Sequence, residues 1–164
     1  MSQAETIAEF EKAIRNFSDC IRALDDGVFL APLNSWSPRG ILAHLIGWNE
    51  YHIKGNDQIL NGEEPFYESE HDENYCKVNS DHSQRISSTD REELLEHLAS
   101  SAKSLAEYTA AVPAEDYAHD FGSRYREGEE DEEVLTVAGV LRETIEDINH
   151  HRVQIEDWAR TLRT

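Results

Sequence analysis

The sequence contains little cysteine, proline or glycine. Its 164 residues include two cysteines, four prolines and eight glycines. One pair of cysteines is too few for a disulfide framework. The local patterns place Cys20 on the apolar face of a helix, as a small core residue, and Cys76 in a polar loop. Because proline and glycine are the weakest helix formers, their scarcity favours long helices and an all-α fold.

Basic residues are also scarce, since 15 lysines and arginines stand against 34 aspartates and glutamates. The formal net charge is −19. Such a chain repels phosphate backbones and anionic membrane surfaces. We therefore expect that neither nucleic acid nor a membrane is a partner. The simplest explanation of the acidic surplus is solubility.

Long hydrophobic runs are missing as well. No stretch approaches the roughly 20 apolar residues that a membrane-spanning helix needs. The N-terminal residues do not show the basic region followed by an apolar run that marks a signal peptide. We therefore expect a cytoplasmic protein.

What the sequence does contain is apolar residues at every third or fourth position, the period of one helix face. The first such stretch carries Ile7, Phe10, Ile14, Phe17, Ile21 and Leu24. The predicted helices cover residues 2–25, 37–60, 89–112 and 136–162. No strand is predicted with comparable clarity, so we expect residues 1–164 to form one domain, a four-helix bundle.

Polar residues mark several ends of these helices. Ser37 and Thr136 are predicted N-caps, and Thr89 with Glu92 matches a capping box. Gly27 is predicted to stop the first helix.

Two polar segments connect the helices. Residues 61–88 are predicted to form a long loop between the second and third helices, with room for a short helix within 73–86. The length of this loop allows a crossover in place of strict up-down-up-down order. A short hairpin is one reading of the acidic segment 113–133.

Two adjacent histidines of the last predicted helix face different directions, because successive residues turn by about 100°. His151 falls on the buried face, whereas His150 points to nearly the opposite side. Asp147 lies one turn before His151, so their side chains can converge on one point. A carboxylate near a bundle core is costly unless it is paired or bound to a cation.

The second predicted helix supplies further candidates, with His44 at the edge of its apolar stripe and His52 within it. One histidine from this helix and the Asp147–His151 pair would form a set of two nitrogens and one oxygen. That set suits Zn²⁺, Ni²⁺ or Fe²⁺. The alternative is that these histidines are hydrogen-bonded core residues. The remaining histidines are predicted to lie on the surface or in loops: His71, His82, His97, His119 and His150.

Two stretches carry a resemblance to a known family. Residues 36–51, "WSPRGILAHLIGWNEY", resemble the second helix of the DinB/YfiT-like superfamily of metalloenzymes, with His44 followed four residues later by Trp48. Residues 147–158, "DINHHRVQIEDW", resemble the last-helix motif of that superfamily. The chain is most similar in character to the branch that contains the DfsB and ClbS-type proteins.

This resemblance implies a four-helix bundle with a divalent metal, expected to be Zn, Ni or Fe, held by three residues. Carried onto this sequence, the ligands are His44, Asp147 and His151. Most relatives have histidine at the position of Asp147. The aspartate can still bind a cation, or it marks a branch that has lost the metal.

The resemblance also implies an activity, a metal-dependent hydrolase or transferase that acts on a small electrophilic or thiol-linked molecule. A protective role is implied by the ClbS-type branch. Trp48, Tyr51 and His52 are expected to line the pocket, and Tyr51 or His52 to move a proton. Residues 61–88 are expected to cover it.

Two other functions remain open. One is a binding protein of the same fold that sequesters a small molecule without turnover. The other is a dimerisation module, in which apolar residues of the first or last helix form the interface of a homodimer.

Overall fold

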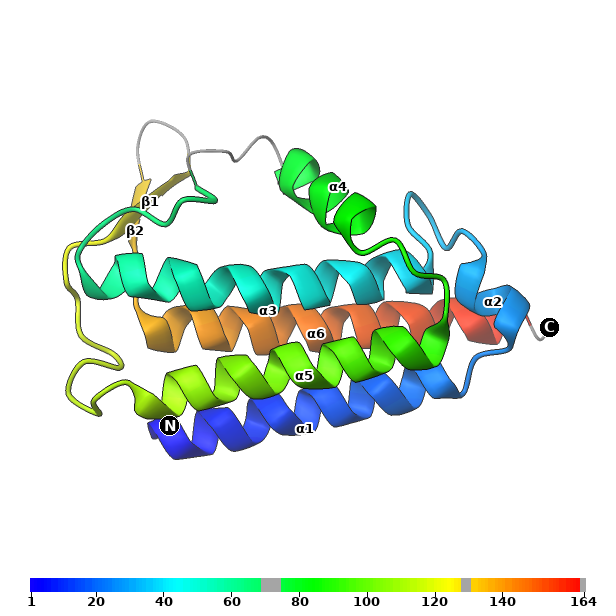
Figure 1. Cartoon of the computed structure of the whole chain (residues 1–164), viewed down its shortest axis with the longest axis horizontal. Helices are drawn as coiled ribbons and strands as arrows, with labels where there is room; N and C mark the ends of the chain where they lie inside the picture. The colour runs from blue at the N-terminus through cyan, green and yellow to red at the C-terminus, as the bar shows by residue number, and fades with distance from the viewer. Residues whose placement is uncertain (69–74, 128–130, 163–164) are drawn as a thin grey trace.

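Four long helices form the body of the protein in the computed structural model, which describes residues 1–68, 75–127 and 131–162 (Figure 1). These helices are α1 (Gln3–Arg22), α3 (Pro38–Leu60), α5 (Arg91–Ala111) and α6 (Val137–Thr161). Each lies within one of the four predicted stretches. The all-α class and the four-helix bundle are therefore confirmed.

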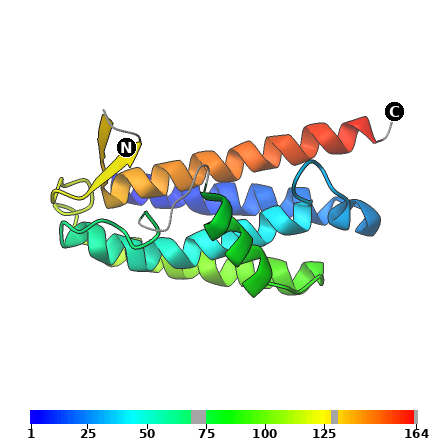
Figure 2. The same ribbon diagram turned by 90° about the horizontal axis from the view of Figure 1, so that it is seen from above.

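The long helices form a ring in which α1 packs against α5 and α6, and α3 packs against the same two helices. Figures 1 and 2 show α3 and α5 running in the same direction, opposite to α1 and α6. The segment between α3 and α5 therefore returns along the length of the bundle. This is the crossover that the long middle segment allowed.

Shorter elements occupy the connections. Helix α2 (Asp26–Leu30) follows α1, and α4 (Cys76–Arg85) lies in the crossover. Strands β1 (Arg124–Glu127) and β2 (Asp131–Val134) pair antiparallel before α6. A short helix within 73–86 and a hairpin within 113–133 were both readings of the sequence, and both are present.

The helix ends agree with the sequence at two of the predicted caps. The side chains of Ser37 and Thr136 accept hydrogen bonds from backbone N–H groups at the starts of α3 and α6. The cap of α5 is different, because the side chain of Asp90 accepts from the N–H of Glu93. The prediction that placed this cap at Thr89 is wrong by one residue.

The first helix also ends earlier than predicted. Helix α1 stops at Arg22, and Gly27 lies inside α2. Nothing lies within 4 Å of the position that a β-carbon on Gly27 would take. Gly27 was predicted to end the first helix. In the structure it lies at the start of a second, short helix instead.

The core contains apolar side chains from all four long helices. Its largest fully buried members include Phe10, Phe17, Ile21, Ile41, Leu42, Ile46, Leu94, Leu98, Leu105, Leu141 and Ile148. Burying a side chain of this size stabilises the fold by roughly 1.5–3 kcal/mol relative to exposure. The core holds α3 and α6 side by side, and these two helices carry every candidate ligand.

Helix α4 crosses the outer face of α3 and is held at its C-terminal end and in its middle. At its C-terminal end, the Arg39 guanidinium donates to the backbone carbonyls of Ser88 and Ile86. In its middle, the His82 ring lies directly over Gly47 of α3, where a β-carbon would come within 2.2 Å of the ring. The glycine inside α3 thus permits the close approach of α4.

The histidine over Gly47 was predicted to lie on the surface, and that prediction is wrong. His82 is 0% exposed, and neither of its ring nitrogens has a hydrogen-bond partner among the residues that the structure describes. Burial lowers its pKa to about 4, with smaller lowering effects from His44 and Arg85 and opposing effects from Glu50 and Asp81. The ring is therefore neutral at pH 7.

Substituting Gly47 with alanine should destabilise the protein. In an ordinary helix interior this change stabilises by about 1 kcal/mol, but here the new methyl group would collide with His82. We expect a loss of about 1–3 kcal/mol in the free energy of unfolding, measured by urea titration. Gly27→Ala is the matched control and should be neutral or stabilising. An equal gain in the free energy of unfolding in both variants would contradict the close approach of α4 to Gly47.

Stability should also fall in mild acid because of His82. The unfolded state binds a proton near the ordinary pKa of 6.5, whereas the folded state resists it down to about 4. The contribution of His82 is therefore complete above pH 6.5 and is lost as the pH falls toward 4, by at most about 1.4 kcal/mol per pH unit. His82→Leu should flatten the dependence of the unfolding free energy on pH over this range. An unchanged slope would show that His82 takes up its proton without cost.

Candidate metal centre

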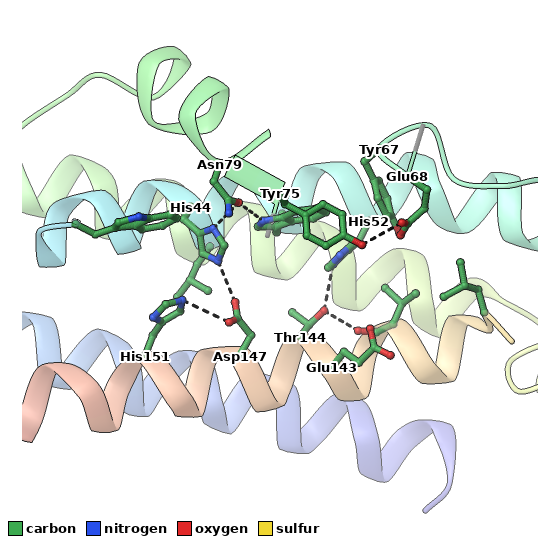
Figure 3. A pocket seen from close by; sticks show the side chains of 15 residues that line it. His44, His52, Tyr67, Glu68, Tyr75, Asn79, Glu143, Thr144, Asp147 and His151 are labelled. Carbon is green, nitrogen blue, oxygen red and sulfur yellow. Dashed lines mark hydrogen bonds and ion pairs between the residues drawn. The ribbon is translucent and has the colours of Figure 1, made fainter. Parts of the chain in front are cut away.

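A cavity of about 450 Å³ lies between α3, α6, α4 and the chain that follows α3. Its wall includes His44, Trp48 and His52 from α3 and Asp147 and His151 from α6. Five of the six predicted site residues are thus brought to one cavity. Figure 3 shows the side chains of the four labelled residues among them pointing into the space between the two helices: His44, His52, Asp147 and His151.

Three side chains converge at one end of the cavity. Nε2 of His44 lies 3.0 Å from one Asp147 oxygen, and Nε2 of His151 lies 3.4 Å from the other. One ligand atom from each of the three residues can be chosen so that all lie within 4.8 Å of one another. Two nitrogens and a carboxylate oxygen at this spacing could hold a metal ion.

The orientation of His44 is set by a neighbour on α4. The Asn79 side-chain oxygen lies 2.9 Å from the indole nitrogen of Trp48 and 3.0 Å from Nδ1 of His44. An indole N–H can only donate, so the atom facing it must be the amide oxygen. That oxygen can only accept, so Nδ1 of His44 must carry a proton. Nε2 is thereby left to face Asp147.

A similar arrangement holds His151. Its Nδ1 donates to Gln154 on the next turn of α6, at 3.1 Å, which directs Nε2 toward Asp147. The indole of Trp36 is stacked on the imidazole with ring centroids 6.2 Å apart. His150 is exposed. The helical geometry had predicted this difference between the two adjacent histidines.

The local electrostatics keep Asp147 and His151 in ligand form. Burial alone would raise the pKa of Asp147, but the hydrogen bond and charge of His44 outweigh it, and the pKa is lowered. Burial lowers the pKa of His151, against the opposing effect of Asp147. Asp147 is therefore a carboxylate and His151 is neutral near pH 7, the states that bind a metal.

His52 lies farther along the cavity. Its Nδ1 is 3.1 Å from the hydroxyl of Thr144, which donates its only proton to the carbonyl of Val140 at 2.7 Å. The hydroxyl must therefore accept from Nδ1–H. No hydrogen bond reaches Nε2 from the described residues. Burial lowers the pKa of His52 to about 4, so Nε2 carries a free lone pair at neutral pH.

Tyr51 is the predicted site residue that the cavity does not include. Its ring packs against His82 of α4 and Phe66, with centroids 4.4 and 4.8 Å away. The prediction that Tyr51 lines the pocket is wrong. It lies one residue from His52 on the same helix, and α4 covers the face on which it lies.

Several cavity residues were not predicted. Glu143 lies four residues before Asp147, so the helical spacing that led to Asp147 could also have found it. Tyr67, Glu68 and Asn79 come from the predicted loop, which has no periodicity to indicate their direction. The expectation that residues 61–88 cover the pocket is met by these side chains. His71 lies outside the described residues.

The architecture and the ligand set together define a class, a four-helix bundle with a candidate metal site between its second and last long helices. The family model of the DinB superfamily matches residues 4–155. The chain belongs to the DinB superfamily. No curated protein sequence matches it significantly.

Solved structures show the same fold. A protein from Streptococcus pneumoniae superposes with a TM-score of 0.77 at 14% identity, over 98% of this chain and 91% of the other. DfsB, described as a sibling lethal factor precursor, superposes with a TM-score of 0.78 at 15% identity. The match covers 100% of this chain and 98% of DfsB. The colibactin self-resistance protein ClbS, in complex with double-stranded DNA, superposes with a TM-score of 0.72 at 17% identity. The match covers 96% of this chain and 94% of ClbS. The predicted likeness to DfsB and ClbS is confirmed at the level of the fold.

The ClbS complex overturns one prediction. Nucleic acid was excluded as a partner from the net charge alone, and a protein of this fold has been solved with DNA bound. Net charge is a sum over the whole surface and does not describe the potential at one face. The exclusion of nucleic acid was therefore wrong. Concerning membranes, no helix among the described residues has the length and apolar character of a membrane span.

Proposed function

We propose that this chain is a metal-dependent hydrolase or transferase that acts on a small reactive molecule in the cavity. The observation that carries this proposal is the convergence of His44, Asp147 and His151 on the cavity wall. A protective role is consistent with ClbS, a self-resistance protein of the same fold.

The donor set fits a divalent cation of the Zn, Ni or Fe type. Two imidazole nitrogens and one carboxylate match the ligand preferences of these ions, and three protein ligands leave coordination positions free. A cation bound there supplies a Lewis acid, which lowers the pKa of a water or thiol and polarises an electrophile. A hydrogen bond between Nε2 of His44 and the Asp147 carboxylate needs a proton on Nε2, and a cation bound at Nε2 would displace that proton.

His52 is the residue proposed to move a proton. It is neutral, its Nδ1–H is engaged by Thr144, and its Nε2 is free to accept. A base of this kind must lie within hydrogen-bond reach of the group that it deprotonates. The indole of Trp48, with its centroid 5.3 Å from that of His52, forms the adjoining wall. Tyr51 has no part in this proposal.

A non-catalytic sequestering protein is the second candidate. One observation favours it: His44 and Asp147 already hydrogen-bond to each other at 3.0 Å, so two of the three ligands are mutually satisfied without a metal. Turnover of a substrate separates the two candidates, because a sequestering protein would bind a small molecule and release it unchanged.

Metal content tests the proposal directly. Protein purified without an affinity tag should contain close to one divalent ion per chain by elemental analysis. His151→Ala should weaken zinc binding by about tenfold or more, because one of three ligands is lost. His150→Ala is the matched control on the exposed side of the same helix and should leave the affinity unchanged. No bound metal, together with equal affinities in the two variants, would refute the proposal.

The contact between Asn79 and His44 should also matter, as a positioning interaction. Asn79→Leu leaves Nδ1 of His44 without an acceptor and frees the ring to turn, so zinc affinity should fall by about 10- to 100-fold. Ser80→Ala, at the next position of α4 and exposed, is the control. Competition with a fluorescent zinc chelator measures both variants. Identical affinities would show that the ring is held by Asp147 alone.

A further inference from the structure

The cavity extends beyond the three candidate ligands. Glu143 lies one helical turn before Asp147, about 6 Å away along the axis of α6. Figure 3 shows Glu143 and Thr144 on one wall, facing Tyr67 and Glu68 on the other. Glu143 is exposed at the rim, and Glu68 is partly buried. This second half of the cavity, formed by Tyr67, Glu68 and Glu143, is called the acidic end below.

The two carboxylates of the acidic end form no ion pair with a basic side chain in the described part of the chain. Among the described residues, neither Glu68 nor Glu143 forms an ion pair, and no lysine or arginine lines the cavity. The hydroxyl of Tyr75 donates to Glu68 at 3.0 Å. Burial raises the pKa of Glu68 to about 7, and Glu143 contributes to the rise. Among the described residues that line the cavity, no basic side chain offsets the negative charge at this end.

Tyr67 adds a buried polar group that also has no partner. Its side chain is 4% exposed and lines the cavity, and its hydroxyl makes no hydrogen bond to any described residue. Its ring packs over Gly55, where a β-carbon would come within 2.5 Å, so the ring is fixed in place. Burial raises the pKa of Tyr67 most, and the charges of Glu68 and Glu143 raise it further. The phenol is thus neutral, and the charges of both carboxylates act on it.

Aromatic faces complete the acidic end. The indole of Trp48 meets the ring of Tyr67 at 5.2 Å and 81°, and the ring of Tyr75 at 5.4 Å and 89°. All three rings line the cavity, so aromatic surface borders the acidic end. The face of an aromatic ring attracts cations, most strongly for tryptophan.

We propose that the acidic end binds an alkylammonium group of the substrate, held by Glu68 and Glu143, by the hydroxyl of Tyr67 and by the aromatic walls. This inference rests on the proposed function, because it assigns the substrate class of the same cavity. The ammonium group lies roughly one helical turn from the candidate ligands. The reactive centre of the substrate is therefore only a few bonds from its positive charge.

A second metal ion is a poorer occupant of this end. Within the described part of the chain, the candidate ligand group consists of His44, Asp147 and His151, and neither Glu68 nor Glu143 belongs to it. A metal also gains little from apolar ring faces, whereas an alkylammonium group gains from both the rings and the charges.

Calorimetry with two probes of equal shape tests the inference. Choline and 3,3-dimethylbutan-1-ol differ in that a neutral carbon replaces the charged nitrogen. With the full chain stripped of metal by EDTA, we expect choline to bind at least about fivefold more tightly than the neutral alcohol. Glu68→Gln and Glu143→Gln should each weaken choline binding by about fivefold, and the double variant by more.

Glu146→Gln is the matched control, since it removes the same charge from an exposed position of α6 that does not line the cavity. It should leave choline binding unchanged. Equal binding of the two probes, no choline binding at millimolar concentration, or equal losses in Glu143→Gln and Glu146→Gln would each overturn the inference. Because this experiment uses metal-free protein, its failure is distinguishable from failure of the metal-binding test.

Discussion

The site depends on one oxygen atom, the side-chain oxygen of Asn79. It accepts hydrogen bonds from the indole of Trp48 and from Nδ1 of His44, and so ties α4 to α3. Because the indole can only donate, this single contact determines which nitrogen of His44 faces Asp147. It also holds α4 over the cavity, with His82 lying against Gly47 beneath it. The ligand orientation and the roof of the cavity therefore have a common cause.

The cavity combines three kinds of chemistry along one line. At one end, two histidines and a carboxylate converge in states suited to a divalent cation. In the middle, His52 presents a neutral nitrogen whose tautomer is set by Thr144. At the other end, two carboxylates lie beside aromatic rings, a combination suited to a positive group. An enzyme with this layout would bind its substrate by charge, place the reactive centre near the metal and remove a proton between them.

Much of the fold and part of the site were predictable from periodicity. Apolar spacing located the four long helices, and the 100° turn between residues separated His151 from His150. The same geometry placed Asp147 beside His151. Periodicity failed at Tyr51, because a helix wheel describes one helix and does not say what covers its second face. It gave no guidance at His82, which lies in a segment that was predicted to be a loop. The cap of α5 was misplaced for a different reason: Thr89 and Asp90 are adjacent, and both side chains can cap a helix.

The sequence by itself determined the helices, the superfamily and the three candidate ligands, because each follows from spacing within one helix or from a motif. The tertiary structure alone decided which loop residues reach the cavity. Asn79, Tyr67 and Glu68 lie in a segment without periodicity, and their directions depend on how α4 and the chain after α3 pack on the bundle. That packing requires two close approaches, His82 to Gly47 and Tyr67 to Gly55. A glycine in a helix shows that something comes near, but not which residue it is.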